Sequence, residues 1–517
     1  MITQGKIKTG EYFDSVTLMQ IGKEIAALPD VIDAACVMGT KENKSILASS
    51  QLLTDDFANV SDSDLLIVIK AANKAVIDAA FSKVDEIFAA KRKKKSASSA
   101  GDTFAPCSIE GAVKVLTDAN LVLISIAGKY AGNEAMKALQ NGLNVMLFSD
   151  NVSLATEIEL KEYAAKKGLL VMGPDCGTAI ITGVPLAFAN VVNSGNIGIV
   201  AASGTGLQEL TCVISNEGAG ISQAIGTGGR DVKQEVGGVM FLAALKALAQ
   251  DPKTEVIVLA SKPPHASVIK KIADIVKTIT KPVIAVFLGA DKQEVEQYGM
   301  IGATTFAETA LKAVALSKKE SFDVVAQRLA KEKAEITKTA EKLVARCNKT
   351  QKYLRGLFSG GTFCAEAQVV FNGVINEIYS NAPMSNAQRL QDSLKSEKNT
   401  VIDLGEDEFT VGRPHPMIDY SLRNRKILQE AQDSNVAVIL LDVVLGYGSN
   451  MDPGAELAPI IKQIRKQVIV IASITGTNND PQNRQKVAAE LAEAGAIIMS
   501  NNAAACLLAA EVIKKLG

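Results

Sequence analysis

Two glycine-rich turns carry the residue types that bind anions. They are Ser203-Gly204-Thr205-Gly206, within residues 195–209, and Ser359-Gly360-Gly361-Thr362, within residues 354–366. At each, an expected strand runs into the turn and an expected helix leaves it, so backbone N–H groups and a helix dipole converge on one point. We expect an anion site at each turn, and two such sites suggest chemistry on a phosphoryl or acyl-phosphate group. Each turn could equally be a tight connection that binds nothing, because glycine is common where the backbone bends sharply.

A third glycine-rich segment, residues 226–231 (GTGGRD), follows an expected strand and places a cation beside flexible backbone. Arg230 could hold a carboxylate or phosphate through two parallel hydrogen bonds, with Gly228 and Gly229 letting the anion approach the backbone. We therefore predict Arg230 as a catalytic cation. An ion pair with Asp231 or another neighbour is an equally good interpretation.

Residues 412–419 (GRPHPMID) hold a histidine between two prolines, which keep the loop stiff and non-helical. Histidine exchanges protons near neutral pH, so we predict His415 as a general acid and Arg413 as an anion clamp. The alternative is a loop histidine that bonds to the backbone.

Further polar residues lie where expected strands end. Lys262 is a candidate phosphate contact, and nearby His265 is expected in a loop or at a helix start. Asn478 and Asn479 could orient a substrate amide or simply form a polar turn. Cys176 and Cys364 lie in or next to glycine-rich loops. Either could be a nucleophile, but a small buried thiol is the commoner case.

Composition excludes several classes of function. Lys and Arg total 55 and Asp and Glu total 56, so the charge balance gives no reason to expect a nucleic-acid partner. The 7 cysteines form no C-x-x-C pair and there are 2 histidines, so we expect no metal site and reduced thiols in a cytoplasmic protein. No apolar run reaches the roughly 18–20 residues of a membrane span, and we expect no membrane partner.

The pattern of apolar segments predicts an α/β protein with a small α+β module at its start. Residues 1–100 form that module, with helices at 14–28 and 71–90 and strands at 31–38 and 64–70. Strands alternating with helices then fill three further units, and residues 318–350 read as a charged connecting helix. The expected strands of the three units are 120–126, 144–148 and 169–172; 197–201, 221–225, 255–260 and 282–287; and 355–358, 400–404, 436–443 and 467–473. The last two units resemble repeats, because each opens with a strand, a Ser-Gly turn and a helix, and each closes with a small-residue helix, at 306–316 and 501–515.

Four segments carry a resemblance to a known family: VMGPDCGT, NIGIVAASGTGLQE, AIGTGGRDV and VGRPHPMID closely resemble the FdrA family. More distantly, the chain is similar to succinyl-CoA synthetase. That resemblance implies several parallel-sheet, Rossmann- or flavodoxin-like domains: a CoA-binding-like domain at 112–192, an alpha-type ligase domain at 196–317 and a beta-type ligase domain at 352–517.

The chain departs from the synthetase where that enzyme carries its phosphorylated histidine. The equivalent loop, residues 298–303 (YGMIGA), has Met300 and no histidine. No ATP-grasp segment precedes the second ligase unit, and the glycine turn that opens the synthetase's CoA-binding domain is missing.

The FdrA resemblance implies a subunit of an oxamate carbamoyltransferase that works with companion subunits in a hetero-oligomer. Such an enzyme converts oxalurate and phosphate to oxamate and carbamoyl phosphate in allantoin or purine breakdown, and we expect no cofactor in this chain. Its partners would be phosphate and a small anionic substrate. Two alternatives stay open: an NDP-forming acyl-CoA synthetase with its ATP-grasp part on another chain, and a non-catalytic scaffold subunit.

Overall fold

The computed structural model describes residues 1–517 except 12, 14, 41, 42, 45, 46, 49, 51, 58, 98–105 and 411–413. Two compact units make up the fold. The N-terminal unit contains Met1–Ala119, Ser125–Ala127 and Asp407–His415. The main unit contains Asn120–Ile124, Gly128–Glu406 and Pro416–Gly517.

The N-terminal unit is built on a three-stranded antiparallel sheet in the order β1-β3-β2. The central strand β3 alternates its side chains between two apolar clusters, with Ile67 and Ile69 on one side and Leu66 and Val68 on the other. This confirms the predicted α+β module, although the first strand was not expected. Its elements are β1 (Ile2–Lys8), α1 (Ser15–Ala26), β2 (Val31–Met38), a 3-10 turn (Asp55–Phe57), β3 (Leu65–Ala71), α3 (Lys74–Ala97), α4 (Ile109–Val115) and α14 (Asp407–Thr410).

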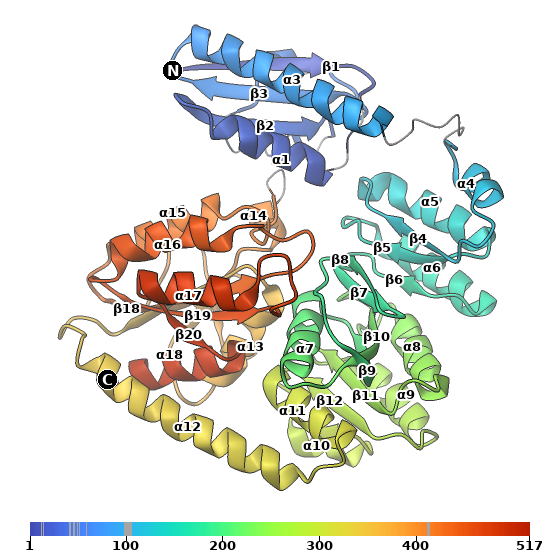
Figure 1. Ribbon diagram of the computed structural model, residues 1–517, viewed down its shortest axis with the longest axis vertical. Coiled ribbons are helices and arrows are strands. Elements are labelled where there is room, and N and C mark those ends of the chain that lie inside the picture. Colours follow the sequence, from blue (N-terminus) through green and yellow to red (C-terminus); the bar gives the residue numbers. More distant parts are fainter. Residues whose placement is uncertain are drawn as a thin grey trace. The chain divides into compact units, whose positions relative to one another are not determined.

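The main unit begins with a small parallel sheet, β4-β5-β6. Its strands are the short apolar runs that the sequence predicted, and helices α5 and α6 alternate with them (Figure 1). The bounds are β4 (Leu121–Ile124), α5 (Gly128–Gln140), β5 (Asn144–Leu147), α6 (Leu154–Lys167) and β6 (Val171–Met172).

Two seven-stranded sheets follow, each with a central strand that leads into a Ser-Gly turn. The first has the order β13-β12-β11-β9-β10-β7-β8 and is parallel except at β7 and β8. Its elements are β7 (Thr178–Ile181), β8 (Val184–Ala187), β9 (Ser194–Ala201), α7 (Gly204–Asn216), β10 (Ile221–Gly226), α8 (Val239–Gln250), β11 (Val256–Ser261), α9 (Ala266–Val276), β12 (Val283–Phe287), α10 (Lys292–Gln297), β13 (Ile301–Gly302) and α11 (Phe306–Ser317).

The second large sheet has the order β16-β15-β17-β14-β18-β19-β20, and its paired strands are parallel. It supports the predicted repeat, because β14 leads into α13 as β9 leads into α7. Its elements are β14 (Tyr353–Phe358), α13 (Gly361–Phe371), β15 (Ile378–Ser380), β16 (Gln388–Arg389), β17 (Asn399–Asp403), α15 (Ser421–Glu430), β18 (Val436–Val444), α16 (Pro453–Ile464), β19 (Ile469–Thr475), α17 (Arg484–Ala494), β20 (Ile497–Met499) and α18 (Asn502–Leu516).

The boundary expected between residues 192 and 196 lies inside a sheet rather than between sheets. Strands β7 and β8 precede it, yet β7 pairs with β10 through Ile180 and Ala224. The two strands form a hairpin whose turn residues, Thr182 and Gly183, have φ of 50° and 81°. Both positive values match a type I′ hairpin, a local structure that gives no sign of which larger sheet it will join.

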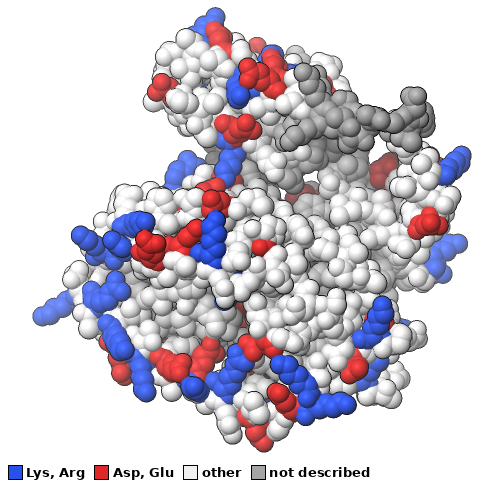
Figure 2. Space-filling model, viewed as in Figure 1, with Lys and Arg blue, Asp and Glu red and all other residues white. Residues whose placement is uncertain are grey.

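Helix α12 (Phe322–Val344) joins the two large sheets as the predicted connecting helix. One stripe of it is buried, formed by Val325, Ile336, Ala340 and Leu343. Val325 packs against α11, and the other three share an apolar cluster with α18. On the face that Figure 2 shows, basic and acidic side chains of the described residues are interspersed. Within the described part of the chain, no helix is both long and apolar enough to cross a membrane.

Candidate functional site

The two predicted anion-binding turns meet within the main unit. The hydroxyl oxygens of Ser203 and Thr362 lie 2.7 Å apart and share a hydrogen bond. Ser203 precedes α7 and Thr362 is the second residue of α13, so the N-termini of these helices converge there, and the two helices contact one another (Figure 1). Two positive helix ends thus point toward one place.

The start of α7 is held by its first residues. Ser203 is the N-cap and its hydroxyl accepts from the Gly206 N–H at 3.1 Å. A Cβ on Gly206 would lie 2.4 Å from that hydroxyl oxygen and 2.7 Å from the Phe306 ring, so only glycine fits. A Cβ on Gly204 would meet nothing within 4 Å, which leaves open space beside the first turn of the helix.

The start of α13 is organised differently, because an internal carboxylate fills the Ser359 turn. Asp442 accepts from the Ser359 N–H at 2.7 Å, the Ser359 hydroxyl at 2.7 Å and the Gly360 N–H at 2.9 Å. Buried Arg423 donates to the same carboxylate at 3.2 Å. The sequence predicted an external anion at Ser359 and Gly360; the structure instead gives these donors to Asp442, a residue that the sequence analysis did not single out.

Four backbone donors remain at the junction. Within the described residues, the N–H groups of Gly204, Thr205, Gly361 and Thr362 have no acceptor. They are among the N–H groups that a helix leaves unpaired in its first turn. A Cβ on Gly360 would lie 2.8 Å from Thr205, so glycine there lets the two helix starts approach each other. Together with the paired hydroxyls, these donors suit an oxyanion.

A lysine and an aspartate stand beside the junction. Lys262 follows β11, is exposed, and has no ion-pair partner in the part of the chain that the structure describes. Asp403 ends β17 and is 4% exposed. Burial and the neighbouring Glu406 raise the pKa of Asp403, Lys262 lowers it, and the net pKa is about 7. This carboxyl therefore carries a proton for part of the time at neutral pH.

Two buried glutamates cross-link the halves of the main unit. Glu209 in α7 accepts from the N–H of Asn502, the first residue of α18, at 3.0 Å. Glu366 in α13 accepts from the N–H of Phe306, the first residue of α11, at 2.8 Å. Each repeat thus caps the last helix of the other. Burial raises the pKa of both carboxyls, that of Glu366 to about 7.

Arg230 is engaged in an ion pair rather than presented to a ligand. Its Nε lies 2.8 Å from Glu157 in α6, and its Nη2 donates to the Val152 carbonyl at 2.8 Å. Glu157 also pairs with the fully buried Lys161 at 2.7 Å, and Lys161 pairs with Asp231 at 2.8 Å. The structure therefore favours the alternative in which Arg230 forms an ion pair over the one in which it binds a ligand.

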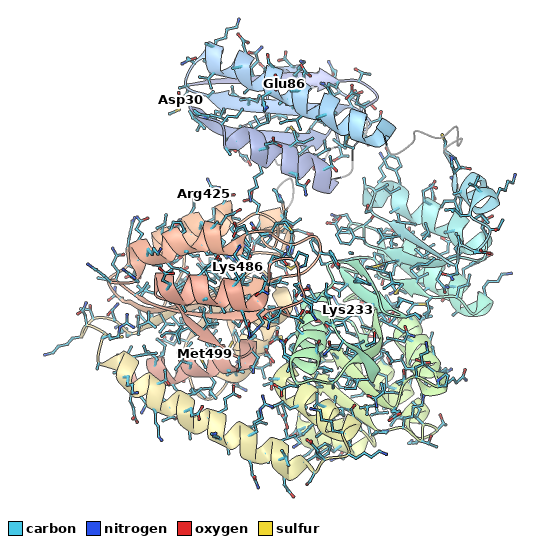
Figure 3. The ribbon with its side chains drawn as sticks, viewed as in Figure 1. Asp30, Glu86, Lys233, Arg425, Lys486 and Met499 are labelled. Carbon is cyan, nitrogen blue, oxygen red and sulfur yellow. The ribbon has the colours of Figure 1, made fainter. Side chains whose placement is uncertain are left out.

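The remaining glycines and asparagines serve local structure. Gly228 has φ of 83°, and a Cβ there would lie 2.5 Å from the Pro174 carbonyl oxygen, so it allows loop packing instead of ligand approach. Gly229 has open space around it. The Asn478 carboxamide accepts from the Gln485 N–H at 3.0 Å at the start of α17, near the labelled Lys486 in Figure 3, and the Asn479 N–H donates to Thr477. This supports the polar-turn alternative.

His415 belongs to the N-terminal unit, not to the main unit that carries Ser203 and Thr362. Burial lowers the pKa of its imidazole to about 4. The ring is therefore neutral at pH 7, which does not favour the predicted role as a general acid near neutral pH. Arg413, its predicted companion, lies outside the described residues.

Cys176, Cys364 and His265 have structural surroundings rather than catalytic ones. Burial raises the pKa of Cys176 to about 12 and raises that of Cys364, so neither thiol ionises readily. His265 is the N-cap of α9. Met300, at the place where the synthetase carries its histidine, is 3% exposed within an apolar cluster.

Family models match three segments of the chain. The AllF, heavy metal-associated domain matches residues 1–104, the CoA binding domain matches 192–289, and the CoA-ligase domain matches 357–512. The CoA-binding match lies beyond the 112–192 unit to which the sequence analysis assigned that resemblance. The chain is thus a protein of CoA-binding and CoA-ligase domains with an AllF-type N-terminal domain.

The chain belongs to the family of the uncharacterized protein YahF from Escherichia coli (strain K12), to which it is 41% identical over 98% of each chain. It is also similar to the alpha subunit of ADP-forming succinate–CoA ligase from Methanothermobacter thermautotrophicus, with 25% identity over 43% of this chain and 75% of the relative. A dinucleotide-forming acetyl-coenzyme A synthetase from Ca. Korarchaeum cryptofilum matches 77% of this chain and 83% of its own at 14% identity, with a TM-score of 0.32.

The name of the N-terminal domain raises the question of a metal, and its residues do not fit one. Residues 1–104 hold one cysteine, Cys36, and no histidine. Cys36 is buried in β2, and burial raises its pKa to about 12. Among the described residues, no cluster of three or more His, Cys, Asp or Glu side chains could hold a metal ion. A soft metal prefers several thiolate or imidazole ligands, and this domain offers none that ionises readily.

Proposed function

We propose that this chain is a cytoplasmic subunit of an oxamate carbamoyltransferase-type enzyme. It would transfer a carbamoyl group between oxalurate and phosphate, giving oxamate and carbamoyl phosphate, and it would work with companion subunits in a hetero-oligomer. The observation that carries this proposal is the junction of α7 and α13, where Ser203, Thr362 and unpaired N–H groups face one another. Two helix N-termini with hydroxyl donors favour a phosphate and its acyl derivatives.

The environment of Met300 supports this reaction over phosphoryl relay. Met300 is packed in an apolar cluster, and a thioether carries no phosphoryl group. Phosphate bound at the junction would instead attack the carbamoyl carbon directly. Lys262 then offers a positive charge for the carboxylate of oxalurate.

The assay is phosphorolysis of oxalurate, with carbamoyl phosphate as the measured product, by the chain combined with its companion subunits. We expect turnover without nucleotide or CoA, and its loss when this chain is omitted. Ser203→Ala should lower the rate, while Thr337→Ala, on an exposed part of α12, should not. Turnover that needs both CoA and ATP would contradict the proposal.

A second candidate is an NDP-forming acyl-CoA synthetase with its ATP-grasp part on another chain. The matches to the CoA-binding and CoA-ligase domains favour it. It requires CoA binding, so saturable binding of CoA to the isolated chain supports this candidate, and failure to bind CoA counts against it. A non-catalytic scaffold would show neither turnover loss after Ser203→Ala nor CoA binding.

A further inference from the structure

Asp403 is fixed in place by contacts on both sides of its backbone. Asn381 accepts from its N–H at 2.9 Å and donates to its carbonyl oxygen at 2.9 Å. One carboxyl oxygen, Oδ1, accepts from the Gly405 N–H at 2.9 Å. Within the described residues the other oxygen, Oδ2, has no hydrogen-bond partner, although the residue is 4% exposed. This oxygen can therefore accept a hydrogen bond from a bound molecule.

That oxygen faces the start of α13. A Cβ on Gly361 would lie 2.3 Å from Asp403 Oδ2, so the glycine is what lets the carboxyl reach the helix start. The next residue, Thr362, holds the hydrogen bond to Ser203 at 2.7 Å. The carboxyl therefore lies beside the donors that would hold an anion.

Three charged groups act on Asp403 from the elements around it. They are Glu406, from the loop after β17, Asp442, from β18, and Lys262, from the end of β11. The two carboxylates disfavour ionisation of Asp403, Lys262 favours it, and burial, which is the largest single influence, disfavours it. Their balance keeps the proton on Asp403 exchangeable around neutral pH.

We propose that Asp403 is the proton-transfer residue of the junction between α7 and α13, with Lys262 as the neighbouring charge that tunes it. This inference rests on the proposed phosphorolysis of oxalurate. It assigns to the carboxyl of Asp403 the role that the sequence had suggested for His415, which is neutral and belongs to the other unit.

Asp403 alone can supply and recover the one proton that the reaction moves. An oxygen of hydrogen phosphate forms a bond to the ureido carbonyl carbon, and the bond from that carbon to the oxamate nitrogen breaks. The nitrogen keeps the electron pair and takes the proton from the Asp403 carboxyl. Asp403 then takes the proton that the phosphate loses as it becomes carbamoyl phosphate. No other reactant is needed, and a group whose pKa lies near the working pH suits both transfers.

The test measures protons taken up as inorganic phosphate binds, by calorimetry in buffers of different ionisation enthalpy. A phosphate beside Asp403 raises the pKa of the carboxyl, so the wild-type chain at pH 7 should take up a fraction of a proton more than Asp403→Asn does. Asp274→Asn, which changes a carboxylate that is 73% exposed on α9, should behave as wild type. Asp403→Asn should bind phosphate within about threefold of wild type but lose about 100-fold or more of the turnover.

The outcomes separate the two proposals. No phosphate binding by the wild-type chain would overturn the anion site and this inference together. Binding with equal proton uptake in wild type and Asp403→Asn would overturn the inference alone.

Lys262→Met gives an independent check in a residue whose side chain is exposed, where folding is not at risk. Lys262 lowers the pKa of Asp403, so its removal should move the pH of half-maximal extra uptake upward. An unmoved midpoint would contradict the tuning role.

Discussion

At the scale of single residues, the two Ser-Gly turns look alike in sequence and differ in what fills them. Ser203 points its hydroxyl at Thr362 across the junction, whereas Ser359 gives its N–H and hydroxyl to Asp442. Asp442 is fully buried and also neutralises Arg423, whose side chain is fully buried too. A buried arginine needs such a partner, so the Ser359 turn stabilises the fold, and the proposed anion site would use the other donors of the junction.

Ser359→Ala should therefore lower stability and leave phosphate binding unchanged. It removes one hydrogen bond to a buried charged group, which costs roughly 1–3 kcal/mol in the free energy of unfolding. Urea unfolding measures that loss, and titration with inorganic phosphate measures the affinity. If Ser359→Ala weakens phosphate binding as strongly as Ser203→Ala does, Ser359 belongs to the anion site after all.

At the scale of elements, the first turns of α7 and α13 would hold the proposed site, and each helix begins with a glycine that has a different role. A Cβ on Gly361 would enter the space of the Asp403 carboxyl, whereas a Cβ on Gly204 would meet nothing within 4 Å. The two positions therefore form a matched pair for testing how closely α13 must approach β17.

Gly361→Ala should displace Asp403 from the helix start, and Gly204→Ala should be tolerated. We expect Gly361→Ala to lose most of the oxalurate phosphorolysis and Gly204→Ala to retain it, with both measured in the same assay. Equal activity of the two variants would show that Asp403 is not needed beside α13.

The glutamates that cap α11 and α18 lead to a prediction about how stability depends on pH. The pKa of Glu366 is about 7 in the folded chain and 4.5 in the reference state, so the folded chain holds the proton more tightly. Stability from this group is fully present below pH 4.5 and falls as the pH rises to about 7, by up to roughly 1.4 kcal/mol per pH unit.

Glu366→Gln should flatten that slope, since the side chain no longer ionises. The measurement is the free energy of unfolding in urea at several pH values between 4.5 and 8. Glu341→Gln, at an exposed position on α12, serves as the control. An unchanged slope in Glu366→Gln would mean that Glu366 is ionised in the folded chain.

Local patterns made much of this fold predictable. Apolar periodicity found the central strands and the repeat, and glycine spacing found both turns at the junction. The short strands β7, β8, β13, β15, β16 and β20 were missed, because their pairing depends on the sheet they join. Sequence reasoning missed four buried carboxylates, because each bonds to residues far away in the sequence: Asp403, Asp442, Glu209 and Glu366. A glutamate six residues into each helix after the turn was the one available signal.

At the scale of the whole molecule, the two large sheets of the main unit each contribute one side of the junction between α7 and α13. Glu209 and Glu366 hold each half to the last helix of the other, and the first residues of α7 and α13 meet between them. The central claim is that their junction binds phosphate directly. The family that includes YahF does not decide this claim, because the matched domain models are described as CoA-ligase and CoA binding. Phosphate binding therefore has to be measured.

The most direct test is calorimetric titration of the chain with inorganic phosphate, without nucleotide or CoA. Saturable binding is predicted for the wild-type chain, and for Thr337→Ala as the control. The double variant Ser203→Ala and Thr362→Ala should bind at least about tenfold more weakly, because it removes both hydroxyls of the junction, and tenfold corresponds to about 1.4 kcal/mol. No binding by the wild-type chain, or equal binding by the double variant, would contradict the account.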